Sequence, residues 1–464
     1  MKPSSTVLKV LTVIAIVGVL MIALMRIGSL VDERRGRAAE AARSIEESQA
    51  GSQALLGPAL QQVCHETWQE TERKNNTVVT TTQRRSITIR STPDLLSIKG
   101  DVAMEPRYRG LFKVNSYQAG TTLSATWSPM QPPTAEHAGG RVTCEAPVIA
   151  VALTDSRGLR DVAIRVNGQP LAVTPGTPFD KQPKGFQAVV TDREAGNTEP
   201  LSAEVTLQLV GTGGLAIAPV GDRNVVDLKS DWPHPSFGGR FLPMKREVRE
   251  NGFDASWTIS SLASTAGRDF LGGAPLCAGV SAVGEPDDPR EYVASSAGSP
   301  CIETFGIAFI DPVNPYSLTD RALKYGLLFI ALSFVAVGMV EVLQRLRVHP
   351  VQYLLVGSAL AVFFLLLLSL SEHLAFGVSY AIASAACVTL LAYYARHILG
   401  GWRAGLAFGA GIAGLYGALF LLLQMEQTAM VLGAVLLFLV LAAVMVATRR
   451  IDWYGLTRST ATPA

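Results

Sequence analysis

Six long apolar segments constrain this chain more than any other feature of its sequence. They cover approximately residues 7–26, 325–343, 351–371, 376–395, 404–424 and 428–447. Each is close to the roughly 20 residues that a helix needs to cross a bilayer core about 30 Å thick. Stretches such as AVFFLLLLSL lack the polar face that a buried helix of a soluble protein shows every 3.6 residues. The sequence therefore predicts a membrane protein with an N-terminal anchor helix and a C-terminal five-helix transmembrane bundle.

The short loops between these segments predict the orientation of the chain. Arginines follow the second, fourth and sixth segments, at Arg345, Arg347, Arg396, Arg403, Arg449, Arg450 and Arg458. The turns SEHLAFG and QMEQTAM carry neither Lys nor Arg. Because positively charged loops stay on the cytoplasmic side, both termini are predicted to be cytoplasmic and the middle of the chain to be exported. The first segment alone has more positive charge after it than before it, and a cleaved signal peptide is the alternative to an anchor there.

The exported middle is predicted to be rich in β-structure. From Thr77 onward, short runs such as RSITIRS, LFKVNSY and AEVTLQLV are rich in Val, Ile and Thr and are separated by turn residues. Such strands in close succession favour antiparallel sheets packed as a sandwich, in one large or two small units. A polar helical stalk precedes them. The predicted organisation is a cytoplasmic N-terminus at 1–6, the anchor at 7–26, the exported domain at 27–322, the five helices within 323–448 and a cytoplasmic tail at 449–464.

Four of the five cysteines lie in the predicted exported domain, where disulfides form. Cys277 and Cys301 are the closest pair, and we hypothesise that they are bonded. Their spacing and the lack of neighbouring histidines argue against a zinc site.

The run DWPHPSFGGRFLP, residues 231–243, is dense in Pro, Gly and aromatic residues, which predicts a rigid loop rather than a strand. Trp232 and Phe237, with Phe241, either present an exposed aromatic patch to a partner or pin the loop onto its own sheet.

Several motifs of this sequence resemble those of the CreD family, bacterial inner-membrane proteins connected with cell-envelope integrity and controlled by a two-component system. The match is densest between 305 and 454, in YSLTDRALKYGLLF, HPVQYLLVG, LLLLSLSEH, YGALFLLLQ and RRIDWYG, and it includes DWPHPSFGGRFLP and FDASW earlier in the chain. The resemblance implies an inner-membrane location, with the exported domain in the periplasm, and an association with envelope stress. It supplies no catalytic residues.

The adjacent Glu372 and His373 are the sharpest polar pair in the apolar third of the chain. They could relay protons or bind a metal, and with Ser371 they suggest a hydrolase; the simpler interpretation is that Ser-Glu-His ends a span in the headgroup region. Glu341 is expected to form a local ion pair with Arg345. In the fifth segment, Gly405 and Gly409 form a GxxxG motif, which predicts close helix packing.

The sequence favours a non-enzymatic protein without a cofactor, since it has no HExxH, no GxSxG and no phosphate-binding glycine loop in a plausible setting. A net charge of +2 argues against a nucleic-acid partner. The expected function is envelope maintenance by binding or scaffolding, with the lipid bilayer and an unidentified envelope protein, lipid or glycan as partners. The alternative is a transporter or transport accessory that uses the C-terminal bundle.

Overall fold

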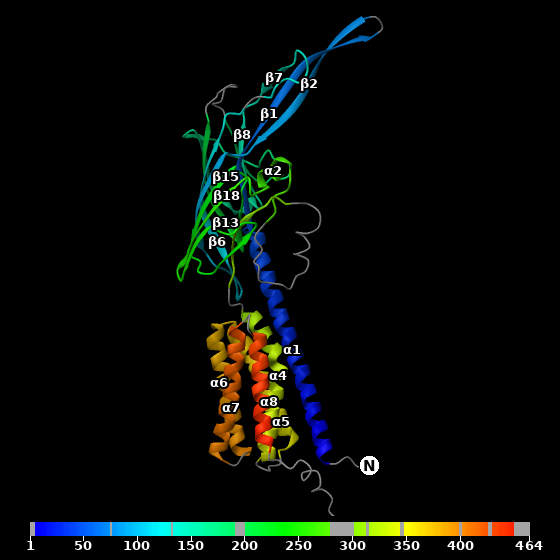
Figure 1. Ribbon diagram of the computed structural model, residues 1–464, viewed down its shortest axis with the longest axis vertical. Helices are drawn as coiled ribbons and strands as arrows, with labels where there is room; N and C mark the ends of the chain where they lie inside the picture. The colour runs from blue at the N-terminus through cyan, green and yellow to red at the C-terminus, as the bar shows by residue number, and fades with distance from the viewer. Residues whose placement is uncertain are drawn as a thin grey trace, which may run out of the picture. The chain divides into compact units, whose positions relative to one another are not determined.

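The computed structural model describes residues 5–74, 77–130, 133–190, 200–278, 301–311, 315–343, 348–398, 401–425 and 429–449, and divides into two compact units. A helical unit comprises Met1–Ala38 and Val313–Ala464, and a β unit comprises Ala39–Pro312. The described parts of the chain thus show the predicted combination of an N-terminal helix, a β-rich middle and C-terminal apolar helices (Figure 1).

The helices of the helical unit are α1 (Ser5–Ser48), whose residues after Ala38 belong to the β unit, α4 (Pro315–Leu343), α5 (Pro350–Ser371), α6 (Phe376–Ile398), α7 (Trp402–Gln424) and α8 (Ala429–Thr448). By length and composition, α1, α4, α5, α6 and α7 are able to cross a membrane. The apolar stretch of α8, Val431–Val446, is shorter, so the sixth span stays a prediction.

Two helix boundaries differ from the prediction. The anchor and the polar stalk form one continuous helix of 44 residues, because no Pro interrupts it and the helix tolerates Gly28 and Gly36 near the junction. Helix α4 begins ten residues before the predicted start at 325, since Pro315 suits a first helical turn and the polar residues that follow continue the helix outside the apolar stretch.

The anchor packs against the other helices of its unit. Leu20 and Leu24 of α1 are buried in a core that includes Phe329 of α4 and Leu360 of α5. A Cβ atom at Gly357 would collide with the Leu20 side chain, so glycine permits this close approach. This packing favours an uncleaved anchor over a signal peptide, because cleavage would remove Leu20 and Leu24 from the core.

The β unit contains two large sheets. The nine-stranded sheet has the order β11-β12-β8-β1-β14-β19-β16, with β2 and β7 also pairing with β1. Its strands are β1 (Gln53–Lys74), β2 (Thr77–Ser91), β7 (Arg141–Cys144), β8 (Val148–Leu153), β11 (Thr174–Pro175), β12 (Gly185–Val189), β14 (Gly214–Ala218), β16 (Pro235–Gly239) and β19 (Phe305–Phe309).

The eight-stranded sheet has the order β10-β9-β13-β6-β3-β15-β18-β17. Its strands are β3 (Leu95–Met104), β6 (Ser116–Trp127), β9 (Leu159–Val166), β10 (Gln169–Leu171), β13 (Leu201–Thr212), β15 (Arg223–Ser230), β17 (Lys245–Arg249) and β18 (Gly252–Ser260). A small hairpin, β4 (Arg107–Arg109) with β5 (Phe112–Val114), the single-turn 3-10 helix η1 (Ser156–Gly158) and the short helix α2 (Ala266–Leu271) complete the described elements.

The two sheets share one hydrophobic core. Leu56 and Ile149 of the first sheet belong to the same buried cluster as Ile98 and Leu123 of the second. In β13, buried and exposed residues alternate along most of the strand, which is the pattern of a sheet with one face on a core. Most pairings are antiparallel as predicted, but β1 pairs with β14, and β3 with β15, in parallel.

The predicted strands begin too late in the sequence. The structure has a long strand, β1, before Thr77, whereas the sequence pattern predicts strands only from Thr77 onward. The outer part of β1 is rich in Gln, Glu and Thr because it lies in a hairpin away from the core, and such a strand lacks a strong apolar alternation.

The prediction of a rigid loop at 231–243 is wrong for the middle of this segment, where Pro235–Gly239 forms strand β16. This strand lies at the end of the sheet order and, among the described strands, pairs with β19 alone; its proline occupies the first position. An edge strand tolerates proline there because the missing N–H is not needed for a second neighbour.

Candidate functional site

The outer part of the nine-stranded sheet forms a polar platform, which we define as residues 61–67 of β1, 84–90 of β2 and strand β7. Strand β1 lies between β2 and β7, and beyond Thr67 it pairs with β2 alone, as a hairpin that extends past the other strands (Figure 1). Because side chains alternate along a strand, the platform has a front face with His65 and Thr67 and a back face with Cys64 and Glu66.

The back face holds a buried carboxylate. The Glu66 side chain is fully buried, and its Oε1 accepts hydrogen bonds from the His137 backbone N–H at 2.9 Å and from the His137 ring at 3.2 Å. Arg85 lies 3.6 Å from Glu66 and 2.7 Å from Glu136. The His137 ring stacks on Trp68 with ring centroids 3.8 Å apart. These contacts hold residues 133–140 against the hairpin.

Hydrogen bonding makes Glu66 sensitive to acid. The backbone hydrogen bond from His137 is the main cause that lowers the pKa of Glu66, although burial opposes it. A carboxyl with a lowered folded-state pKa stabilises the fold above its unfolded pKa of about 4.3, and this contribution is lost as the pH falls through the folded pKa.

We therefore expect the hydrogen-exchange protection of residues 133–140 to fall below about pH 4. The pH dependence should be absent from Glu66→Gln and retained in Glu70→Gln, which changes an exposed carboxylate on the same strand. A Glu66→Gln profile identical to that of the unmodified protein would contradict this role of Glu66.

The front face is open and carries hydroxyl, imidazole and guanidinium groups. Thr67 has Arg84 on one side and Arg141 on the other, and in the next row His65 has Ser86 and Thr143 as neighbours. His65 lies 3.1 Å from the Ser86 hydroxyl and 2.8 Å from a Glu145 carboxylate oxygen. The backbone of the central strand is used in pairing with β2 on one side and β7 on the other.

Two disulfides lie in the β unit. Cys64 of β1 is bonded to Cys144 of β7, directly opposite it in the ladder, and closes a loop with a sequence separation of 80. Cys277 is bonded to Cys301, the pair that the sequence hypothesis named. Cys387 in α6 is a buried free thiol.

The candidate pair Glu372 and His373 does not form a joint site. Glu372 lies 3.5 Å from Arg34 of α1, and Asp320 of α4 lies 4.0 Å from Arg35. His373 is exposed. The buried Ser371 hydroxyl donates to the backbone carbonyl of Leu368, so the hydroxyl is used within its own helix. These contacts fit the interpretation in which Ser-Glu-His ends a span, and the structure adds an ion pair between this turn and the anchor helix.

An equivalent contact lies at the opposite end of the same helices. Lys9 of α1 pairs with Glu341 of α4, and the Tyr353 hydroxyl donates to Glu341 at 2.9 Å. The predicted partner, Arg345, lies outside the described residues. Polar contacts therefore join the anchor to the bundle at both ends, while apolar packing joins them in between.

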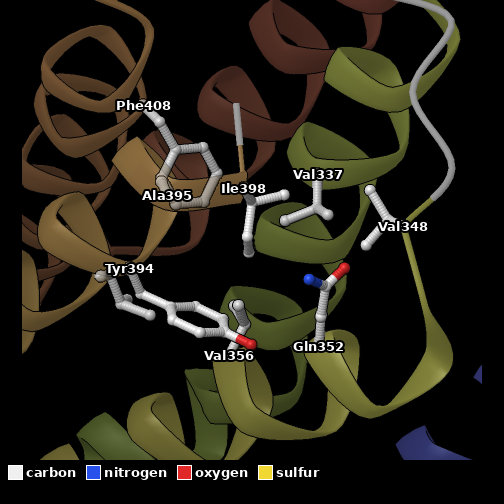
Figure 2. A pocket seen from close by; sticks show the side chains of 9 residues that line it. Val337, Val348, Gln352, Val356, Tyr394, Ala395, Ile398 and Phe408 are labelled. Carbon is white, nitrogen blue, oxygen red and sulfur yellow. The ribbon is translucent and has the colours of Figure 1, made fainter. Parts of the chain in front are cut away.

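A small cavity lies among α4, α5, α6 and α7. Its volume is about 30 Å³, which is space for a few water molecules at most. Figure 2 shows Tyr394 and Gln352 among otherwise apolar lining residues. The remaining lining residues are Val337, Val348, Val356, Leu391, Ala395, Ile398 and Phe408.

The aromatic candidates of β16 and the segment before it face inward. Trp232 is 9% exposed, and its indole N–H donates to the His234 carbonyl. Phe237 packs edge-on against Phe253 and Trp257. These contacts favour the pinning interpretation over an exposed patch.

Comparison with known proteins decides the family. The model of the family described as inner membrane protein CreD matches residues 5–454. The chain belongs to the CreD family. A curated CreD relative, the inner membrane protein CreD of Escherichia coli strain K12, is 33% identical over 437 residues, which are 94% of this chain and 91% of the relative. Family membership and the apolar helices together show that this CreD protein is an inner membrane protein.

Solved structures add little to the CreD assignment. Crystal structures of an M1 zinc metallopeptidase from Deinococcus radiodurans match with TM-scores of 0.20 to 0.21 and 11 to 13% identity. They cover 36% of this chain and 38% of theirs. This likeness is too slight to carry an argument about the CreD chain.

Sequence reasoning missed the platform of this CreD protein. Its central strand was not predicted, and the partners of Glu66 and Cys64 lie about 70 to 80 residues away in the chain. One signal was present: His65, Glu66 and Trp68 follow Cys64 within four residues, which concentrates reactive, titratable and aromatic groups in a polar segment.

Proposed function

We propose that the protein supports cell-envelope integrity and the envelope-stress response by binding or scaffolding another envelope component through a periplasmic β unit. In this proposal both termini are cytoplasmic. The hairpin of β1 and β2 is the observation that supports it most. From Trp68 to Lys74 strand β1 pairs with β2 alone in the described sheet, so both outer edges of the ribbon offer unpaired backbone groups. Such edges are templates for pairing with another molecule.

A shortened hairpin tests this proposal. Thr71 and Thr80 are directly opposite partners, so a two-residue Asn-Gly turn can replace residues 72–79 without changing the register. We expect cells that carry this variant in place of the native protein to lose protection against envelope-damaging agents at an unchanged protein level. Unchanged protection would show that the ribbon does not carry the function.

Substitution of the Ser-Glu-His turn separates scaffolding from chemistry. We expect His373→Ala to leave envelope protection unchanged, because the side chain is exposed and the Ser371 hydroxyl is bonded within its helix. Glu372→Ala should behave like Arg34→Gln, since both remove the same ion pair. Lost protection in His373→Ala or Glu372→Ala at a normal protein level, with Arg34→Gln unaffected, would instead indicate a chemical role for the turn.

The transporter alternative has less support. In the described part of the helical unit, the charged contacts join helix ends, and the cavity in Figure 2 has room for a few waters only. Transport sites are usually built from charged residues or broken helices near the membrane midplane.

A further inference from the structure

We propose that the front face of the platform is a binding site for a phosphate-type oxyanion, held between Arg84 and Arg141 over Thr67. This inference rests on the proposed binding function of the β unit. It specifies the chemical class of ligand that one surface of the β unit would bind.

The arrangement begins with strand register. Arg84 of β2 and Arg141 of β7 are both direct partners of Thr67, so the three side chains form one row on one face. Neighbouring strands are about 4.8 Å apart, which places the two arginine Cα atoms roughly 10 Å apart. Guanidinium groups on flexible side chains can converge from this separation on one anion above the threonine.

The charge of the row is uncompensated. Both arginines are exposed, and among the residues that the structure describes neither has an ion-pair partner. By contrast, Arg85 on the back face is close to two carboxylates, and Arg90 lies 3.3 Å from Asp180. Two like charges on one row repel each other, and a bound oxyanion would remove that repulsion while accepting bidentate hydrogen bonds.

The groups beside the row suit the same ligand. Ser86 and Thr143 flank His65 in the adjacent row. Ser86 lies 3.1 Å from the His65 ring and the Thr143 hydroxyl donates to the His65 carbonyl at 3.5 Å, so each hydroxyl has to turn before it donates to a phosphate oxygen. The Glu145 carboxylate beside this row is engaged by His65 at 2.8 Å. Among the described residues, the two carboxylates that contact this face, Glu145 and Asp180, are engaged by His65 and Arg90, so neither is paired with Arg84 or Arg141.

The test measures pyrophosphate binding to the full-length protein in neutral detergent by isothermal titration calorimetry. We expect salt-sensitive binding that weakens at least tenfold in the double variant Arg84→Gln with Arg141→Gln. The matched control is Arg160→Gln with Arg165→Gln, which removes two exposed positive charges from β9 in the other sheet and should change affinity less than twofold. Arg84→Lys with Arg141→Lys keeps the charge but loses the bidentate geometry, and should show an intermediate loss.

Absence of pyrophosphate binding, or equal weakening in the two Gln variants, would overturn the proposal. Nanodiscs distinguish the source of the phosphate. Displacement of pyrophosphate by phosphatidylglycerol nanodiscs, but not by phosphatidylcholine nanodiscs, would support the site and identify a lipid headgroup as its ligand. Tight pyrophosphate binding that neither displaces would support the site and indicate a soluble phosphate compound.

The binding experiment and the cellular test of the shortened hairpin can fail independently of each other. If the Arg84 and Arg141 variant loses pyrophosphate binding while cells keep their envelope protection, the site stands and the proposed function does not require it. If the shortened hairpin abolishes protection while the arginine variant binds pyrophosphate normally, the proposed function stands and the oxyanion site does not.

Discussion

Replacing Cys64 and Cys144 together by Ser is expected to lower the free energy of unfolding of the β unit by up to about 4.5 kcal/mol, the chain-entropy value for a loop of this length. The bond joins β1 to β7 next to Glu66, so its loss also frees the segment that buries this carboxylate. We expect residues 133–144 to become sensitive to limited proteolysis before the rest of the unit unfolds.

Urea titration of the detergent-solubilised protein, followed by tryptophan fluorescence, measures this loss. Cys387→Ala is the control, because this free thiol lies in the helical unit and should leave the β-unit transition unchanged. A loss below about 1 kcal/mol in the double variant would show that the bond contributes little to holding the platform together.

The second large effect is expected in the helical unit, where Gly409→Leu should destabilise the packing of α6 on α7 by about 3 kcal/mol. A Cβ atom at Gly409 would lie 2.7 Å from the Ala392 Cβ, and one at Gly405 would lie 2.9 Å from the Arg396 backbone. Both contacts are too close for any side chain larger than hydrogen without movement of a helix.

Gly414→Leu is the matched control on the same helix. A Cβ atom at Gly414 meets no atom within 4 Å among the described residues, so the substitution should change stability by less than about 0.5 kcal/mol. The fraction of protein that stays monodisperse after heating in detergent compares the two variants. Equal losses would mean that the small residues act through another surface of α7, and not through α6.

The GxxxG motif shows which features of the helical unit could be predicted from the sequence. Apolar length and small-residue spacing are local properties of a helix, and they predicted the spans and the close packing of Gly405 and Gly409. The sequence left open whether the partner helix belongs to the same chain, and the structure identifies it as α6. The partner of Glu341 was not predictable in this way, because Lys9 lies 332 residues away.

In the β unit, too, the local sequence pattern predicted some elements and missed those that depend on distant contacts. Alternating strands such as β13 were predicted from their sequence, because one face lies on the core. The inner part of β1 pairs with strands on both sides, and its outer part lies in a ribbon, so neither part has a simple period. Contacts such as Glu66 with His137 depend on strand register and on a loop that returns to the sheet, which the local pattern of residues does not contain.

We propose that the β unit lies on the periplasmic side of the membrane and that the α6–α7 turn is cytoplasmic. Labelling of intact spheroplasts with a membrane-impermeant maleimide tests it most directly, in a Cys387→Ala background that carries either Leu262→Cys or Arg403→Cys. Leu262 is 97% exposed in the β unit, and Arg403 is exposed at the start of α7. We expect Leu262→Cys to be labelled in intact spheroplasts and Arg403→Cys to be labelled only after permeabilisation. The reverse pattern would contradict the orientation and, with it, the proposed periplasmic role.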